Sequence, residues 1–125
     1  MKSLVISVDF DGTCVTHEYP AVGKDIGAQR VLKQLVDKGH RIILFTMRSG
    51  IELEEAKLWF ARNGIPLFGV NENPEQHTWT TSPKPFSHFY IDDMALGCPL
   101  KSDGRSRMFV NWDRIEQMLI DGGVL

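Results

Sequence analysis

Short apolar runs alternate along this chain with longer stretches in which apolar residues recur every three or four positions. The first run, residues 4–8, is rich in β-branched side chains, which is typical of a strand buried on both faces of a parallel sheet. The apolar runs predict strands over residues 4–8, 41–46, 67–70 and 89–91, and a short one over 108–110. The helical spacing predicts helices over about 25–38, 49–63 and 113–120.

Strands that alternate with helices in this way favour one architecture. We expect a three-layer α/β fold with a doubly wound, mostly parallel sheet of Rossmann-like topology. Residues 1–125 are expected to form a single domain, because no internal repeat and no long linker divides them. The polar segment 14–24 is expected to be a surface loop over the site, and the proline-containing segment 71–85 is also expected to be a loop.

Polar residues follow three of the expected strands directly. They are Asp9 and Asp11 after the first strand, Thr46 after the second, and Asp92 and Asp93 after the fourth. Because the carboxyl ends of parallel strands meet at one edge of a sheet, we expect these side chains to lie close together. Carboxylates at the end of a buried strand are costly unless a cation or hydrogen-bond donors compensate them. The pattern therefore indicates a site rather than a plain Asp-Gly turn.

The chemistry of these residues suits phosphoryl transfer. Several carboxylates in one crevice repel one another unless a cation lies among them, and all-oxygen ligands suit Mg²⁺. Thr46 precedes an expected helix start and offers a hydroxyl group and backbone N–H groups to phosphate oxygens. Lys84, just before the fourth strand, adds a positive charge. A carboxylate nucleophile, a proton donor, a metal ion and donors for phosphate oxygens are the parts that this reaction needs.

Composition narrows the class of protein only a little. Lys and Arg number 14 against 16 Asp and Glu, for a net charge of -2, so no basic surplus points to nucleic acid. Asp9 interrupts the first apolar run, and we therefore expect neither a signal peptide nor a membrane span there. Cys14 and Cys98 are expected to be reduced thiols, which is consistent with a cytoplasmic protein.

The chain resembles the haloacid dehalogenase superfamily of phosphohydrolases over nearly its whole length, in the order of the four motifs of that family. The matching motifs are Asp9-Phe10-Asp11-Gly12-Thr13, Thr46, Lys84 and Asp92-Asp93. The first and fourth motifs are the specific ones, because a single Thr or Lys has little weight by itself.

The resemblance implies a role for each motif residue. Asp9 would attack phosphorus and form an aspartyl-phosphate, and Asp11 would act as general acid and then as general base. Mg²⁺ would be bound by the Asp9 carboxylate, the Asp11 backbone carbonyl and one residue of the fourth motif. Asp92 is the expected direct ligand, with Asp93 acting through water or orienting Lys84, although the reverse assignment stays open.

The other implied contacts are with substrate. Thr46 and Lys84 would hold the transferred phosphoryl group, and Arg48, directly after the second motif, either contacts substrate or is an ordinary surface residue. The four histidines show no ligand spacing and are expected to be surface or structural residues.

The resemblance also implies what the site would accept. No segment is long enough for the cap domain of many relatives, so the site is expected to be open. The segment from Lys84 to Leu100 is most similar to small phosphatases of capsule or sugar biosynthesis. The expected substrate is therefore a sugar phosphate or another small phosphate ester. A polynucleotide phosphate end stays open, as in more distant capless relatives, and a homo-oligomer is possible.

Two other classes of protein share part of this pattern. A response-regulator receiver domain has a similar length and a similar set of residues, but its adjacent acidic pair follows the first strand and its phosphorylated Asp follows the third. Here the pair follows the fourth strand, and Val70 at the end of the third is followed by Asn71. A catalytically inactive phosphate-binding protein on the phosphatase fold is the second alternative.

Overall fold

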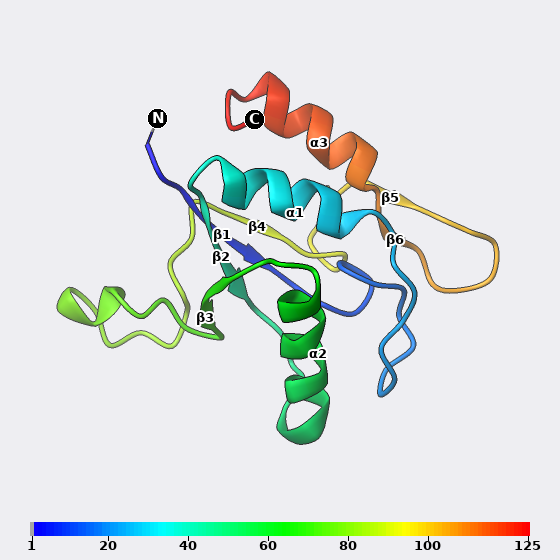
Figure 1. Ribbon diagram of the computed structural model, residues 1–125, viewed down its shortest axis with the longest axis horizontal. Helices are drawn as coiled ribbons and strands as arrows, with labels where there is room; N and C mark the ends of the chain where they lie inside the picture. Colours follow the sequence, from blue (N-terminus) through cyan, green and yellow to red (C-terminus); the bar gives the residue numbers. More distant parts are fainter. Residues whose placement is uncertain (1) are drawn as a thin grey trace.

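A central parallel sheet of four strands organises the computed structural model, which describes residues 2–125 (Figure 1). Its strands are β1 (Val5–Val8), β2 (Arg41–Leu44), β3 (Leu67–Val70) and β4 (Phe89–Ile91). They lie in the order β3-β2-β1-β4, and every neighbouring pair is parallel. All four residues of β1 are buried, because this strand lies between two neighbours and is covered on both faces.

Helices flank the sheet, and a small antiparallel pair follows it. These elements are α1 (Ala28–Asp37), α2 (Gly50–Arg62), the 3-10 helix η1 (Gln76–Thr78), β5 (Leu100–Lys101), β6 (Phe109–Val110) and α3 (Trp112–Asp121). Figure 1 shows α1 and α3 running next to each other, with α2 apart from them and the β5–β6 hairpin extending to one side. A four-stranded parallel sheet flanked by helices confirms the α/β prediction and is compatible with a Rossmann-like core.

One apolar cluster joins the sheet to all three helices. The apolar faces of α1, α2 and α3 supply Leu32, Phe60 and Leu119 to the same cluster as Ile6 and Val8 of β1. Burial of these side chains is the main favourable contribution to folding. The cluster also holds β1 rigidly, so the residues that follow Val8 begin from a fixed point.

The strand order creates a crevice beside β1. The chain passes from β1 to β2 and β3 on one side and then returns to place β4 on the other side of β1. Connections that leave in opposite directions open a crevice at the carboxyl ends of the two strands, and ligands of α/β sheets commonly bind there. The residues that follow β1 and β4 therefore meet at this point.

Two predictions for the segment after β1 were wrong. Segment 14–24 is not a surface loop throughout, because Cys14, Val15 and Thr16 are buried. The first helix begins at Ala28 and not near residue 25. Asp25 instead pairs with Val15 in an isolated bridge, and its side chain accepts a hydrogen bond from Trp59 Nε1 at 2.9 Å. These contacts hold the residues before Ala28 outside the helix.

Other local predictions had mixed outcomes. Helix α2 begins after Ser49, as expected, but the Ser49 side chain makes no capping hydrogen bond. The short elements β5 and η1 were not predicted. Both cysteines are free thiols. Among residues 2–125, no helix has the length and apolar character needed to cross a membrane.

Candidate functional site

Three carboxylates meet in the crevice between β1 and β4. Asp9 follows β1, Asp92 and Asp93 follow β4, and one carboxylate oxygen from each lies within 4.8 Å of the others. The convergence expected from the sequence is therefore present for these three residues. The pairing of Ser7 with Tyr90 and of Val8 with Ile91 sets the register that brings the two strand ends level.

Thr13 connects the two sides of this acidic cluster. Its buried hydroxyl lies 3.0 Å from Asp9 Oδ2 and 3.2 Å from Asp93 Oδ1, and it accepts a hydrogen bond from the Asp93 N–H at 3.0 Å. A hydroxyl has one proton to donate, so Thr13 cannot compensate both carboxylates at once. Thr13 was expected to belong to the first motif without a role of its own, although its place at the end of that motif was the available signal.

Gly12 allows the close approach of Asp93 to the first motif. Its φ is +78°, and a Cβ atom at this position would overlap Asp93 Oδ2. Any other residue would collide with that carboxylate and would adopt an unfavourable backbone conformation. Gly12 therefore contributes to the site because its lack of a side chain leaves room for the Asp93 carboxylate.

The cluster is electrostatically incomplete by itself. Burial, and next the charge of Asp92, raises the pKa of Asp9 to about 8. Burial also raises the pKa of Asp92. Within residues 2–125, no Lys, Arg or His nitrogen lies within 4.0 Å of the carboxylate oxygens of Asp9, Asp92 or Asp93. One buried and two half-buried carboxylates with oxygen atoms this close fit a hard divalent cation such as Mg²⁺.

Asp11 does not join this cluster, because its side chain forms an ion pair with Arg48. The Arg48 Nε and Nη2 groups donate to Asp11 Oδ2 and Oδ1, each at 2.8 Å. The two side chains are 14% and 1% exposed, with Arg48 the more buried. This bidentate hydrogen bonding to Asp11 raises the pKa of Arg48. Both oxygens of Asp11 are thus held as acceptors.

The remaining N–H groups of Arg48 bind backbone carbonyls. Nη1 donates to Pro20 at 3.3 Å and to Glu52 at 3.1 Å, and Nη2 donates to Ala21 at 2.8 Å. All five donors of the guanidinium group are therefore occupied. The prediction of a surface Arg48 was wrong, and the prediction that Arg48 contacts substrate finds no free donor in this arrangement.

Thr46 and Lys84 lie near the site but outside the acidic cluster. The Thr46 hydroxyl accepts from the Arg48 N–H at 3.1 Å, and the Thr46 N–H donates to Asn71 Oδ1 at 2.7 Å. Lys84 is exposed, and its Nζ lies 5.5 Å from the centre of the Tyr90 ring. It shares a neighbouring cavity with Asp92. In the described part of the chain, no ion pair joins Lys84 to Asp93.

A cavity of about 470 Å³ opens in front of the acidic cluster. Its lining comprises Asp9, Asp11, His17, Tyr19, Met47, Asp93, Met94 and Arg107. Five of these were not assigned to a site from the sequence, namely His17, Tyr19, Met47, Met94 and Arg107, and His17 among them was expected to be a surface or structural residue. They come from four separate segments that only the fold brings together, so no local motif identifies them.

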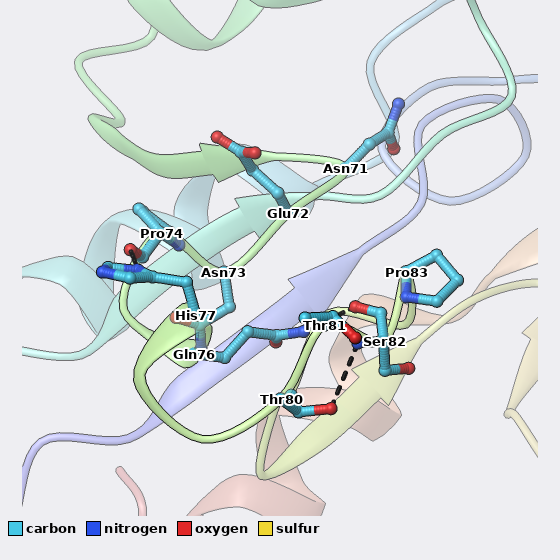
Figure 2. Close-up of a pocket in the computed structure, with 10 residues that line it drawn as sticks. All are labelled: Asn71, Glu72, Asn73, Pro74, Gln76, His77, Thr80, Thr81, Ser82 and Pro83. Carbon is cyan, nitrogen blue, oxygen red and sulfur yellow. Dashed lines mark hydrogen bonds between the residues drawn. The ribbon is translucent and has the colours of Figure 1, made fainter.

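A second cavity of about 470 Å³ lies in the segment between β3 and β4 and contains none of the motif residues (Figure 2). Ser82 N–H donates to the Thr80 hydroxyl at 3.1 Å, and His77 Nδ1 lies 2.9 Å from the Pro74 carbonyl oxygen. These contacts lie within the loop itself. The loop expected over 71–85 is confirmed, apart from η1.

Comparison with known proteins identifies a related protein but no activity. No family model matches the chain, and no curated protein matches it significantly. The solved structure of a conserved protein from Bacteroides thetaiotaomicron is similar to it, with 33% sequence identity and a TM-score of 0.78. The similarity covers 97% of this chain and 93% of that protein. This chain therefore belongs to the same family as that conserved Bacteroides protein.

Proposed function

We propose that this chain is a magnesium-dependent phosphomonoester hydrolase of the haloacid dehalogenase type, with a doubly wound core and no cap domain. The observation that carries this proposal is the meeting of Asp9, Asp92 and Asp93 within 4.8 Å of one another at the end of a buried strand. Such a cluster has a physical use if a cation neutralises it and one carboxylate reacts. Asp9 suits the reaction because it lines the open cavity in front of the cluster.

The reaction then has two steps. A carboxylate oxygen of Asp9 forms a bond to phosphorus while the bond from phosphorus to the ester oxygen breaks, and Asp11 gives a proton to that leaving oxygen. In the second step water attacks the phosphorus of the aspartyl-phosphate, Asp11 takes a proton from this water, and Asp9 leaves as a carboxylate. Thr46 and Lys84 would position the oxygens of the phosphoryl group.

Mg²⁺ would be held by the Asp9 carboxylate, the Asp11 backbone carbonyl and a carboxylate of Asp92 or Asp93. When bound, it would compensate the negative charge of the phosphoryl group and the carboxylates. One observation favours Asp93 as the direct ligand and another favours Asp92. Asp93 lines the same cavity as Asp9, whereas the Asp92 charge has the larger effect on the pKa of Asp9.

The ion pair of Asp11 with Arg48 adds a condition to this mechanism. Because Arg48 donates to both oxygens of Asp11, proton transfer by Asp11 would compete with this ion pair. The same observation favours the second candidate, a phosphate-binding protein that does not turn over. A Mg²⁺-dependent turnover assay separates these two functions.

The test is the release of phosphate from para-nitrophenyl phosphate with Mg²⁺. We expect multiple turnovers that stop when EDTA is added. The Asp9→Asn variant should lose turnover by at least about a thousandfold, whereas Asp37→Asn, at the exposed end of α1, should match the wild type. Turnover that persists in EDTA, or in Asp9→Asn, would contradict the proposal.

The same assay separates the other classes of protein. A receiver domain would accept one phosphoryl group per chain from a small phosphodonor and release it slowly, without sustained turnover. An inactive relative would bind phosphate without hydrolysing any ester. The physiological substrate is proposed to be a sugar phosphate or another small phosphate ester in the cytoplasm, and the open site also permits a polynucleotide phosphate end. A homo-oligomer is compatible with the same proposal.

A further inference from the structure

Arg107 brings a positive charge to the cavity in front of the acidic cluster. It lies in the 102–108 connection between β5 and β6, and its side chain lines the same cavity as Asp9 and Asp93. Every carboxylate in that cavity comes from the cluster and from Asp11. Among the residues that line this cavity, Arg107 is the one with a permanent positive charge.

The hairpin that carries Arg107 is fixed to the first motif. The Val110 N–H donates to the Gly12 carbonyl at 3.0 Å, and Trp112 Nε1 donates to the Thr13 carbonyl at 2.6 Å. Trp112 and Val110 are both buried. The position of the hairpin relative to Asp9 is thus set by contacts with the first motif itself. In Figure 1 this hairpin extends on the same side of the sheet as the segment that follows β1.

Arg107 also has donors available for a ligand. Among residues 2–125, no carboxylate oxygen lies within 4.0 Å of its nitrogens, and its side-chain hydrogen bond is with His17 Nε2 at 3.2 Å. Arg48 provides the contrast, because all of its donors are occupied and it is buried. The Arg107–His17 pair therefore offers donors to an anion, while Met47 and Met94 form exposed apolar edges of the same cavity.

We propose that the cavity selects phosphate esters that carry a second anionic group, a carboxylate or another phosphate, and that Arg107 and His17 bind this group. The proposal rests on the proposed phosphatase function and adds the class of substrate. A guanidinium group matches the paired oxygens of carboxylate and phosphate, and such charge-assisted hydrogen bonds are among the stronger ones in proteins. With the reacting phosphoryl group at Asp9, the second anion would lie beside Arg107 in the same cavity.

The test compares matched pairs of esters. 3-Phosphoglycerate and glycerol 3-phosphate differ by a carboxylate, and fructose 1,6-bisphosphate and fructose 6-phosphate differ by a phosphate. We expect the wild type to favour the more anionic member of at least one pair by about tenfold or more in kcat/KM. Arg107→Ala should bring that ratio close to one, Arg107→Lys should keep part of it, and Arg105→Ala, in the same hairpin, should leave it at the wild-type value.

The outcomes distinguish the two proposals. The pair that shows the preference identifies carboxylate or phosphate as the second group. Equal ratios in the wild type and Arg107→Ala, with glycerol 3-phosphate still hydrolysed, would overturn the anion site alone. If no ester is hydrolysed, the proposed function fails, and calorimetric Kd values for the same pairs then decide. A preference lost in Arg107→Ala would support the anion site, and equal or undetectable binding would overturn it.

Discussion

At the scale of single residues, the site depends on how Thr13 is shared between Asp9 and Asp93. The Thr13 hydroxyl lies close to both carboxylates and also accepts the Asp93 N–H. One hydroxyl proton leaves one of these carboxylates without a donor from Thr13. Thr13 therefore fixes the geometry of the cluster and leaves its charge to be balanced by a cation.

Replacing Thr13 tests that role. In Thr13→Val the buried Asp93 N–H loses its acceptor, and the free energy of unfolding should fall by about 1–3 kcal/mol. Thr13→Ser keeps the hydroxyl and should recover most of the loss that comes from hydrogen bonding. Urea denaturation of the three proteins measures the difference. A loss in Thr13→Ser with little or no loss in Thr13→Val would show that packing of the methyl group, rather than the hydroxyl, matters.

Gly12 gives a second prediction at this scale. In Gly12→Ala the new methyl group would meet the Asp93 carboxylate, so Asp93 must move and the affinity for Mg²⁺ should fall by about tenfold or more. Gly97→Ala is the control, because Gly97 also has a positive φ of +91° but nothing lies within 4 Å of its added Cβ. Calorimetric titration with Mg²⁺ measures both variants. Equal affinities in the two variants would show that the collision has no consequence for the site.

At the scale of elements, Arg48 joins three parts of the chain that the sequence keeps apart. Its guanidinium group binds Asp11 after β1, the carbonyls of Pro20 and Ala21, and the Glu52 carbonyl in the first turn of α2. Segment 14–24 is thus attached to the site and to a helix through one side chain. Its buried part needs such an attachment, because it has almost no regular secondary structure of its own.

Removing the Arg48 side chain should therefore be costly. Arg48→Ala leaves the Asp11 carboxylate and three carbonyls without their donor, and loss of one partner of a buried ion pair typically costs about 3–5 kcal/mol. Arg48→Lys keeps the charge but not the bidentate geometry, so its free energy of unfolding should lie between those of the wild type and Arg48→Ala. Urea denaturation gives both values, with exposed Arg62→Ala at the end of α2 as the control. A loss below about 1 kcal/mol in Arg48→Ala would contradict the structural role.

The elements themselves could largely be predicted from the sequence. The runs at 67–70 and 89–91 have the predicted bounds, because a continuous apolar run between polar residues is a local signal. The two-residue strand Leu100–Lys101 has no such signal, since its pairing with Phe109 and Val110 depends on residues eight or more positions away. The burial of segment 14–16 likewise depends on the fold and not on its own composition.

At the scale of the whole molecule, the acidic cluster could be predicted while its surroundings could not. Parallel strands place their carboxyl ends at one edge, so Asp9 and Asp93 could be expected at that edge, whereas the position of β4 directly beside β1 was not predicted. The partner of Asp11 is 37 positions away, and the partner of Arg107 is 90 positions away. Contacts of this kind depend on how loops cross the sheet edge, for which neither periodicity nor a motif gives a rule.

The acidic cluster also makes a prediction for the stability of the whole fold. Without a cation, Asp9 has a pKa of about 8 in the folded protein and about 3.9 when unfolded. Between these values the folded state holds the extra proton, so the stabilisation present below pH 4 is lost as the pH rises through 8, by at most about 1.4 kcal/mol per pH unit. The raised pKa of Asp92 acts in the same direction.

Mg²⁺ should reverse this loss, because it binds the folded state with Asp9 ionised and competes with the proton. The rise in Tm on adding Mg²⁺ should therefore be larger at pH 8 than at pH 5, where the proton already neutralises Asp9. Each kcal/mol corresponds to about 3–5 °C for a domain of this size. Asp9→Asn carries no titrating group and should show a flatter pH dependence and a smaller effect of Mg²⁺. An effect of Mg²⁺ on Tm that is equal at both pH values, or unchanged in Asp9→Asn, would place the cation elsewhere on the molecule and separate the raised pKa of Asp9 from metal binding.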